Sequence, residues 1–433
     1  MPSSTQPEVL SIAIIGSGPG GLSAGIALSQ LPNVYVRIFE KAPAISDLGG
    51  GISINHNGWK VLEYLGARKA VTGAATVPTV QRNAYTGEVV DPGFKHNPND
   101  LYQARRTRRS RLQNALYTEV PKNTVHFNKK LVTLENLEEK GVRLIFADGS
   151  QTTADIVVGG DGIRSVVRQH IYPDYKINYV GSVGWRTLVP VSAISHIPDI
   201  SLTVTNWWRG AGSAIYMSPV DELSNLEHME VSCRSVNEPE VPGETVSWGK
   251  PVGNEKVLSR FQDYYPPMVE VLKQVPEGGW KEFSGYAGPF IENLTGWGKL
   301  VLIGDASHPS GGGFGSGSAF AMEDSWILAR TIEYSRSISG GVADALRIYN
   351  SIRAPYYKKM FEFRETQQLS LKKSGQKSRE GFNERLRELM SKDGLGGRRS
   401  SEFLEFVYGS DVKKVWEEYL EKENGSRSGK LSS

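Results

Sequence analysis

The sequence predicts an α/β protein that has a parallel-sheet domain, an inserted and largely antiparallel sheet, and a helical C-terminal region. Two observations predict the parallel domain. Strand and helix patterns alternate up to about residue 78, and runs typical of buried strands return at Ile156 to Gly160 and at Leu300 to Ile303. A third observation predicts the insertion, because residues 179–285 carry many short alternating runs instead.

Composition limits the classes of protein to consider. The 433 residues allow two or three lobes. With 22% charged residues and a net charge of +3, the chain requires neither nucleic acid nor an acidic partner. The single cysteine, Cys233, excludes a disulfide framework and favours a reducing, cytoplasmic location. No apolar run approaches the length of a membrane span, so we expect no stable membrane insertion.

The first element is a strand, turn and helix near the N-terminus. The apolar run from Ile12 to Ile15 is followed at once by Gly16-x-Gly18-x-x-Gly21 and then by a helical pattern through Ser29. Glu40 ends a second apolar run, nineteen residues after Gly21. This is the layout of a dinucleotide-binding unit, in which the glycines allow a tight turn, close approach to a pyrophosphate and close helix packing. Glu40 would accept hydrogen bonds from a ribose hydroxyl.

The segments that follow are less regular. A helix is expected from Arg109 to Val120. A meander is expected from the runs Val125 to Phe127 and Val142 to Phe146, with the turn that follows them. The chain is mainly helical from Glu323 on, and residues 424–433 are polar and expected to be disordered.

A second motif follows the strand at 156–160. It reads Gly159-Gly160-Asp161-Gly162 and leads into a helix start. The Asp161 carboxylate is expected either to cap that helix or to hydrogen-bond the glycine turn of a neighbouring element. The alternative to a ligand-binding role for this motif is a purely structural turn that caps the helix and binds no ligand.

A third motif follows the strand at 300–303. It reads Gly304-Asp305-Ala306-Ser307-His308-Pro309, and a glycine-rich stretch from Ser310 to Ser318 then enters a long helix. Asp305 at a strand end is well placed to hold the hydroxyls of a ribityl chain. Gly315 and Ser318 lie where the stretch enters the helix, whose N-terminus stabilises negative charge.

Together the three motifs resemble the flavin-dependent aromatic hydroxylases of the p-hydroxybenzoate and salicylate hydroxylase type, over about residues 9 to 370. The resemblance implies FAD as cofactor and NAD(P)H as a transient co-substrate. It implies a Rossmann-like FAD-binding domain and a substrate domain, and the residue pattern adds a C-terminal helical region and a disordered tail. Their boundaries are 1–78, 104–178 and 286–370 for the first, 79–103 and 179–285 for the second, 371–423 for the third and 424–433 for the last.

The resemblance also assigns site residues. The first motif, with Gly16, Gly18, Gly21 and Glu40, would bind the ADP part of FAD. The remaining cofactor-binding residues would be Gly51, Arg109, Asp161, Asp305, Gly315 and Ser318. Arg186 and Tyr216, on strands of the substrate sheet, resemble active-site residues of fungal members. From the residue pattern, Tyr216 either orients the substrate or packs in the sheet core.

The third motif departs from the family pattern. The family usually has a proline four residues after the histidine of this motif, and Gly312 stands there instead. A more mobile loop is expected. His308 is expected to pack within the loop rather than to act in catalysis.

The arginines at 105, 106, 108, 109 and 111 form a basic cluster. No aromatic platform accompanies them, so a solvated face with phosphate contacts to FAD or NADPH is favoured over nucleic acid. The seven histidines and one cysteine show no metal-ligand spacing, and no metal is expected.

These features predict a monooxygenase that uses FAD, NAD(P)H and O2 to hydroxylate a small aromatic or polyketide-like compound through a flavin C4a-hydroperoxide. One alternative is decarboxylative hydroxylation of a hydroxybenzoate-like acid. Others are an oxidase or reductase, a halogenase of the same fold and a non-enzymatic flavoprotein. The Trp-x-Trp-x-Ile-Pro segment of halogenases is absent from the sequence.

Overall fold

The protein is described here by a computed structural model. The structure describes residues 9–45, 50–75, 79–92, 101–236, 238–240, 248–311, 314–373, 384, 386 and 401–431. In this part of the chain, no helix is both long enough and apolar enough to cross a lipid bilayer.

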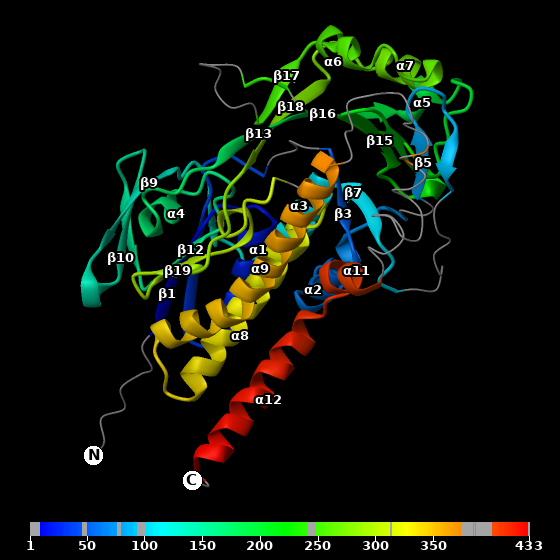
Figure 1. The fold of residues 1–433 in the computed structure, drawn as a ribbon. Coiled ribbons are helices and arrows are strands. Elements are labelled where there is room, and N and C mark those ends of the chain that lie inside the picture. The colour runs from blue at the N-terminus through cyan, green and yellow to red at the C-terminus, as the bar shows by residue number, and fades with distance from the viewer. Residues whose placement is uncertain are drawn as a thin grey trace, which may run out of the picture.

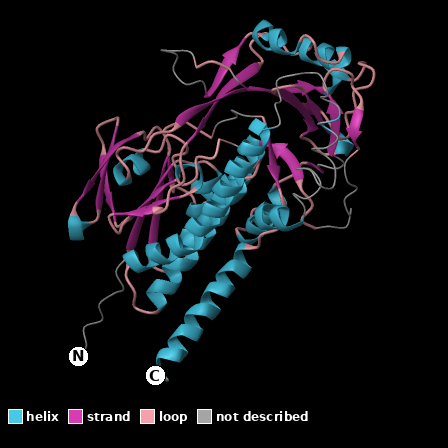
Figure 2. Ribbon diagram, viewed as in Figure 1, coloured by secondary structure: helices cyan, strands magenta, loops and turns pink. Residues whose placement is uncertain are grey.

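A six-stranded, mainly parallel sheet forms the centre of the first domain (Figures 1 and 2). Its interior strands are nearly fully buried, because helices cover both of its faces. Only the edge strand β19 runs antiparallel. In spatial order the strands are β19 (Thr295–Gly296), β20 (Leu300–Leu302), β12 (Ile156–Gly159), β1 (Leu10–Ile15), β2 (Val34–Phe39) and β8 (Val125–His126).

Long helices pack against this sheet and against one another. Helix α1 is buried along almost its whole length, and Ser325 of α8 donates a hydrogen bond to the carbonyl oxygen of Gly20 in α1 at 2.8 Å. Figure 1 shows α8 and α9 running side by side across the middle of the molecule. The helices of this domain are α1 (Pro19–Ser29), α2 (His56–Tyr64), α3 (Arg109–Glu119), α4 (Val166–Ile171), α8 (Gly317–Ser337) and α9 (Val342–Lys373).

Two three-stranded sheets flank the parallel one. One is a meander of β9 (Leu131–Asn136), β10 (Val142–Phe146) and β11 (Gln151–Ala154). The other joins β3 (Gly51–Ile54), β7 (Arg105–Arg108) and β4 (Ala74–Ala75). Short 3₁₀ helices are η1 (Arg68–Ala70), η2 (Glu138–Lys140), η3 (Leu223–Asn225) and η4 (Gly304–Ala306).

The expected meander differs from the observed one in its first strand. Val125 and His126 form β8, which extends the parallel sheet beside β2. The exposed edge of β2 supplies the partners: Ile38 donates its N–H to Thr124, and Glu40 donates to His126. Residues Leu131–Asn136 take the place of this segment in the meander.

An eight-stranded sheet forms the second domain. Its neighbouring strands are antiparallel except β14 and β5, and β5 and β6 reach it from the segment that precedes α3. In spatial order the strands are β17 (Trp248–Val252), β18 (Trp280–Ala287), β13 (Asn178–Pro190), β16 (His228–Val236), β15 (Ser213–Pro219), β14 (Thr205–Arg209), β5 (Thr79–Asn83) and β6 (Val89–Asp91).

The two faces of this sheet differ because side chains alternate along each strand. One face carries Trp185, Trp208 and Cys233 into a separate hydrophobic core. Helices α5 (Val191–Ile194), α6 (Asn254–Phe261) and α7 (Pro266–Lys273) complete that core, and α6 and α7 lie on the outer side of the sheet in Figure 1. The opposite face, with Arg186 and Tyr216, is therefore available for a site.

The chain ends in α11 (Ser401–Tyr408) and α12 (Val412–Leu431). Helix α12 packs along α8, where Trp416 meets Tyr334 edge to face with ring centroids 5.8 Å apart. Helix α12 runs to Leu431, and disorder of the tail over 424–433 stays a prediction. An established helix gains one backbone hydrogen bond for each residue added, so even this polar segment extends it.

Candidate active site

The glycine turn after β1 has the tight turn and the close helix packing that its spacing predicts, and the approach to a pyrophosphate stays a prediction. Gly16 has φ +96°, a conformation that favours glycine. A Cβ on Gly21 would lie 1.9 Å from the carbonyl oxygen of Gly16, so only glycine lets α1 approach the turn. A Cβ on Gly18 would meet no described residue within 4 Å. Gly18 thus leaves open space at the N-terminus of α1, where a pyrophosphate would lie.

Glu40 is fixed beside this turn. One carboxylate oxygen accepts hydrogen bonds from the backbone N–H of Ser17 at 2.8 Å and from its hydroxyl at 2.9 Å. The other oxygen accepts from the backbone N–H of Ala42 at 2.8 Å. These bonds hold the carboxylate at the end of β2, and its role toward a ribose hydroxyl stays a prediction.

Asp161 caps a helix. Its Oδ2 accepts hydrogen bonds from the backbone N–H groups of Val166 at 2.7 Å and Val167 at 3.2 Å, at the start of α4. Its Oδ1 is buried and has no hydrogen-bond partner among the described residues, and burial raises the pKa of the carboxyl. The sequence left two roles open, and the structure shows the capping role. The unpaired oxygen would suit a hydroxyl donor of the cofactor.

Asp305 lies on η4, and its side chain is exposed. Arg109, the first residue of α3, is close enough to Asp305 and Glu40 for both carboxylates to raise the pKa of its guanidinium, although burial has the larger, lowering effect. The three side chains thus come together from three distant segments. Alternating carboxylates and a guanidinium are suited to the hydroxyls and phosphates of FAD.

The glycine-rich stretch after η4 enters α8. Gly315 has φ +65°, and a Cβ there would meet nothing within 4 Å in the described part of the chain. Ser318 lies in the first turn of α8, and Asn55, which precedes α2, donates a hydrogen bond to the hydroxyl of Ser316. Gly312, where the family pattern has proline, lies outside the described residues. With the open positions at Gly18 and Gly315, the unpaired Asp161 oxygen and the exposed Asp305, the chain fits FAD.

A buried polar network that the sequence did not reveal anchors the third motif. Asp324 of α8 accepts a hydrogen bond from the N–H of Gly304 at 2.8 Å, next to Asp305. Its other oxygen accepts from Nε of Arg353 and from the hydroxyl of Tyr357, both at 2.6 Å. Arg353 also meets Glu323 at 3.3 Å. This network fixes the backbone on which Asp305 stands.

His308 belongs to the same network. It is buried, its Nδ1 lies 2.9 Å from the hydroxyl of Ser307, and its ring stacks on Tyr357 with centroids 4.2 Å apart. Burial lowers the pKa of its imidazole. The structure therefore places His308 within the packed loop, as the sequence analysis expected.

Arg186 and Tyr216 share one row on the open face of the large sheet. Arg186 of β13 is opposite Ser232 of β16, and Ser232 is opposite Tyr216 of β15. The next residue in the row is Trp207, whose ring meets Tyr216 edge to face with centroids 4.7 Å apart. Neighbouring Trp208 points into the opposite core. The structure therefore brings the two predicted catalytic residues together.

Positive charge surrounds Arg186. Burial first, and then the charges of Arg106, Arg234 and Arg109, lower the pKa of its guanidinium to about 10, so it remains charged near neutral pH. The crowding by neighbouring protein atoms that lowers this pKa is partial, because the side chain still reaches solvent on the open face of the sheet. Among the residues that the structure describes, Arg186 contacts the Phe283 ring at 5.7 Å but makes no hydrogen bond or ion pair. The Arg186 guanidinium is therefore available to bind an anionic group.

The basic cluster differs from the expected solvated face. Arg106 is buried, and its guanidinium pairs with Glu230 of the large sheet and lies over the Tyr216 ring at 5.0 Å. Arg108 and Arg111 both pair with Asp221, at 3.3 and 2.9 Å. These arginines therefore join the two domains, because carboxylates from the inserted domain reach them.

Gly51 is part of this junction. A Cβ on it would lie 2.6 Å from Oε2 of Glu230 and 2.8 Å from Cγ1 of Val220. Glycine is needed here for close packing of β3 against the inserted domain, and contact between Gly51 and the cofactor stays a prediction.

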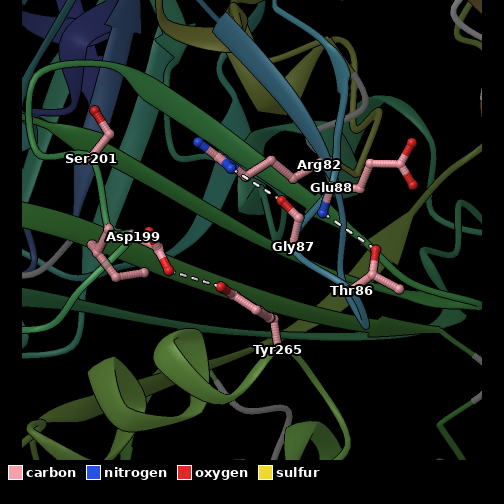
Figure 3. Close-up of a pocket in the computed structure, with 8 residues that line it drawn as sticks. Arg82, Thr86, Gly87, Glu88, Asp199, Ser201 and Tyr265 are labelled. Carbon is pink, nitrogen blue, oxygen red and sulfur yellow. Dashed lines mark hydrogen bonds between the residues drawn. The ribbon is translucent and has the colours of Figure 1, made fainter.

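The inserted domain also carries a surface hollow of about 590 Å³ beside β5 and the turn that joins it to the edge strand β6 (Figure 3). Its polar groups are already paired: Arg82 donates to the carbonyl oxygen of Gly87 at 3.1 Å, and Tyr265 donates to Asp199 at 3.0 Å. None of the predicted site residues lines it. We therefore do not place the active site there.

Replacing Gly18 with alanine is expected to leave the apoprotein folded but to weaken FAD binding at least tenfold, about 1.4 kcal/mol. The added methyl group meets open space in the protein and would occupy the position of the pyrophosphate. Titration of apoprotein with FAD measures the effect, and Gly341→Ala, also in open space, is the control. Unchanged FAD affinity of Gly18→Ala would contradict the placement.

The buried Glu323 makes stability depend on pH. Burial raises the pKa of its carboxyl from 4.5 to about 7, and Arg353 and Asn57 offset this only in part. The folded state binds this proton more tightly than the unfolded state does. The protonated carboxyl therefore contributes to the free energy of unfolding in full below the unfolded pKa of 4.5, and this contribution is lost as pH rises through about 7. We expect Glu323→Gln to reduce the fall in urea midpoint between pH 5.5 and 8.

The control for this experiment is Glu333→Gln, which changes an exposed carboxylate on the same helix. Urea unfolding of both variants and of the wild-type protein at the two pH values is the measurement. If Glu323→Gln and wild-type protein lose stability equally over this range, another group carries the pH dependence.

The comparisons with known proteins agree with this geometry. Residues 9–250 match a family described as FAD binding domain. The chain is 28% identical to 6-methylsalicylate 1-monooxygenase of Aspergillus terreus, over 79% of each chain. It is 29% identical to 6-hydroxynicotinate 3-monooxygenase of Bordetella bronchiseptica, over 79% of this chain and 87% of that one.

Solved structures share the fold. A salicylate hydroxylase in complex with its substrate superposes with a TM-score of 0.72 at 20% identity, covering 94% of this chain and 97% of that chain. The structure of CtdE in complex with FAD and a substrate has a TM-score of 0.80 at 16% identity, with 97% and 100% coverage. Both likenesses concern the whole arrangement of two domains.

Proposed function

The chain belongs to the FAD-binding-domain family, and from this premise we propose that it hydroxylates a small anionic aromatic compound. It is an FAD-dependent monooxygenase, with NAD(P)H and O2 as co-substrates. The observation that carries the choice of substrate is the guanidinium of Arg186, which pairs with none of the described residues and lies on a sheet face with further positive charge.

FAD, when bound, supplies the activation of O2 with electrons from NAD(P)H. In our proposal the chain holds it with the N-terminus of α1 at Gly18, the acceptors Glu40 and Asp305, and the guanidinium of Arg109. The N-terminus of α8, at Gly317, would stabilise negative charge on the flavin ring of the bound cofactor. The remaining predicted residues Gly16, Gly21, Gly51, Asp161, Gly315 and Ser318 shape this cradle.

Arg186 would hold the carboxylate or phenolate of the substrate by a charge-assisted, bidentate pair. Tyr216 is half-buried, and among the described residues its hydroxyl makes no hydrogen bond. That favours an orienting role for Tyr216 over simple packing. Trp207 and Phe283 supply aromatic surface beside the two residues. The two relatives described above are named for substrates that are carboxylic acids.

Two outcomes are possible on such an acid, and we rank hydroxylation at a ring C–H first. Hydroxylation at the carboxylate-bearing carbon with loss of carbon dioxide is the second candidate, because Arg186 suits both. A cytoplasmic location also belongs to this proposal, which the single cysteine, buried and unpaired, supports.

A panel of salicylate, 6-methylsalicylate, 6-hydroxynicotinate and the matching phenols without a carboxylate tests the proposal. We expect an acid to stimulate NADH or NADPH oxidation at least tenfold more than its phenol. Carbon dioxide released in equal amount to the NAD(P)H consumed would reverse our ranking of the two reactions. Oxidation that yields only hydrogen peroxide with every compound would remove support for both.

A further inference from the structure

The C-terminal helices form a small unit that packs against the FAD-binding domain. This C-terminal unit, residues 401–431, comprises α11 and α12 and contacts α2 and α8. Val407 and Val412 are buried, and Trp416 is 8% exposed. The unit therefore has its own share of the core, and the reaction described above gives it no task.

One contact joins the C-terminal unit to the glycine-rich stretch at the proposed flavin site. The hydroxyl of Tyr408, the last residue of α11, donates a hydrogen bond to the carbonyl oxygen of Phe314 at 2.7 Å. Phe314 precedes Gly315, which has φ +65°, and α8 begins at Gly317. Tyr408 thus holds the backbone immediately before the helix N-terminus that faces the flavin in our proposal.

A second contact anchors the connection between α11 and α12. The carboxylate of Asp411 pairs with Lys60 at 3.1 Å and accepts a hydrogen bond from Tyr64 at 3.0 Å, both on α2. The Lys60 and Asp411 side chains are only 16% and 12% exposed, so this ion pair is poorly screened by solvent. Asn55, just before α2, donates a hydrogen bond to the hydroxyl of Ser316, which lies in the same stretch as Phe314.

A third contact reaches the first turns of α8. Phe406 of α11 packs on Tyr356 with ring centroids 4.7 Å apart, and Tyr356 meets Phe320 of α8 at 5.9 Å. Tyr356 is adjacent to Tyr357, which hydrogen-bonds Asp324 in the network that holds Gly304. The C-terminal unit therefore contacts the glycine-rich end of the third motif at Phe314, and it is linked to Gly304 only indirectly, through α9 and Asp324.

We propose that the C-terminal unit positions the flavin loop, residues 314–318, and that Tyr408 is its positioning residue. The inference rests on the proposed binding of FAD at this loop. Glycine allows a loop to adopt several backbone conformations. The hydrogen bond from Tyr408 to the carbonyl oxygen of Phe314, just before Gly315, selects one of these conformations. The loop would then be ordered before the cofactor arrives, which strengthens binding by reducing the entropy lost on association.

Tyr408→Phe tests this proposal because it removes one hydroxyl and keeps the ring. We expect the Kd for FAD, measured by titrating apoprotein and following flavin fluorescence, to rise about fivefold, the loss expected for one hydrogen bond. Amide hydrogen exchange of the peptide that covers residues 314–318 should quicken by a similar factor in the apoprotein. The visible circular dichroism of the bound flavin should also change, which a loss of global stability alone would not cause.

Tyr419→Phe is the matched control, because it removes a hydroxyl from the same C-terminal unit. Tyr419 stacks on Trp416 of α12 rather than on the flavin loop. Asp411→Asn is the second variant, and it should raise the Kd for FAD in the same direction as Tyr408→Phe. If both variants bind FAD as tightly as wild-type protein, with unchanged exchange of the loop, the positioning role is overturned. Failure of the wild-type protein to bind FAD would instead overturn the proposed function.

Discussion

Replacing Asp305 with alanine is expected to release most of the FAD from the protein. The carboxylate is exposed at the end of β20, beside Arg109, and would accept hydrogen bonds from hydroxyls of the cofactor. Each bond to a charged acceptor is worth about 1.5–3 kcal/mol, so losing one raises the Kd for FAD roughly tenfold to a hundredfold and losing two raises it further. The ratio of flavin to protein absorbance after purification measures the loss.

The fold should survive this substitution. Asp324 holds the backbone at Gly304, and the bonds of this network do not involve the Asp305 side chain. Asp344→Ala is the control, because it removes an exposed carboxylate that pairs with Arg347 near the start of α9. A yellow Asp305→Ala protein with a full complement of FAD would show that Asp305 does not hold the cofactor.

Replacing Arg186 with glutamine is expected to lower kcat/KM for an aromatic acid at least tenfold while FAD content stays the same. Tenfold corresponds to about 1.4 kcal/mol of transition-state stabilisation, less than a charged, bidentate pair can supply. Because Arg186 pairs with no side chain among the described residues, its removal leaves no partner unsatisfied. It also relieves repulsion from Arg106 and Arg234.

Arg260→Gln is the matched control, since Arg260 lies on α6 at the outer side of the same domain and pairs there with Glu238. Steady-state kinetics with the acid and with its phenol separate the two roles of Arg186. A loss confined to the acid identifies a carboxylate contact, and an equal loss on both identifies a contact to the phenol oxygen. Unfolding or loss of FAD in Arg186→Gln would assign the residue a structural role instead.

The sequence predicted the local elements of the FAD-binding domain well. The glycine turn, α1 and β2 lie where the motif places them, because close backbone packing at Gly16 and Gly21 admits no other residue. Asp161 and Asp305 likewise lie at strand ends, as their apolar flanks predicted. The alternating strands of residues 179–285 form most of one antiparallel sheet.

Contacts between segments far apart in the sequence could not be predicted from local sequence patterns. Arg106 and Glu230 are 124 residues apart, and neither has a neighbour in sequence that marks it as half of a buried ion pair. The bond between Asp324 and Arg353 was hidden in the same way on two long helices. Strand β8 joined the parallel sheet because β2 offered a free edge, and edge pairing leaves no signature in two residues.

The most direct test of the monooxygenase activity uses isotopically labelled dioxygen. The FAD-loaded protein is mixed with labelled O2, with NADH or NADPH, and with an aromatic acid that stimulates oxidation of the NAD(P)H. We predict that the product gains one labelled oxygen atom for each NAD(P)H consumed, as a monooxygenase requires. A product without labelled oxygen, or labelled hydrogen peroxide in equal amount to the NAD(P)H consumed, would contradict the assignment.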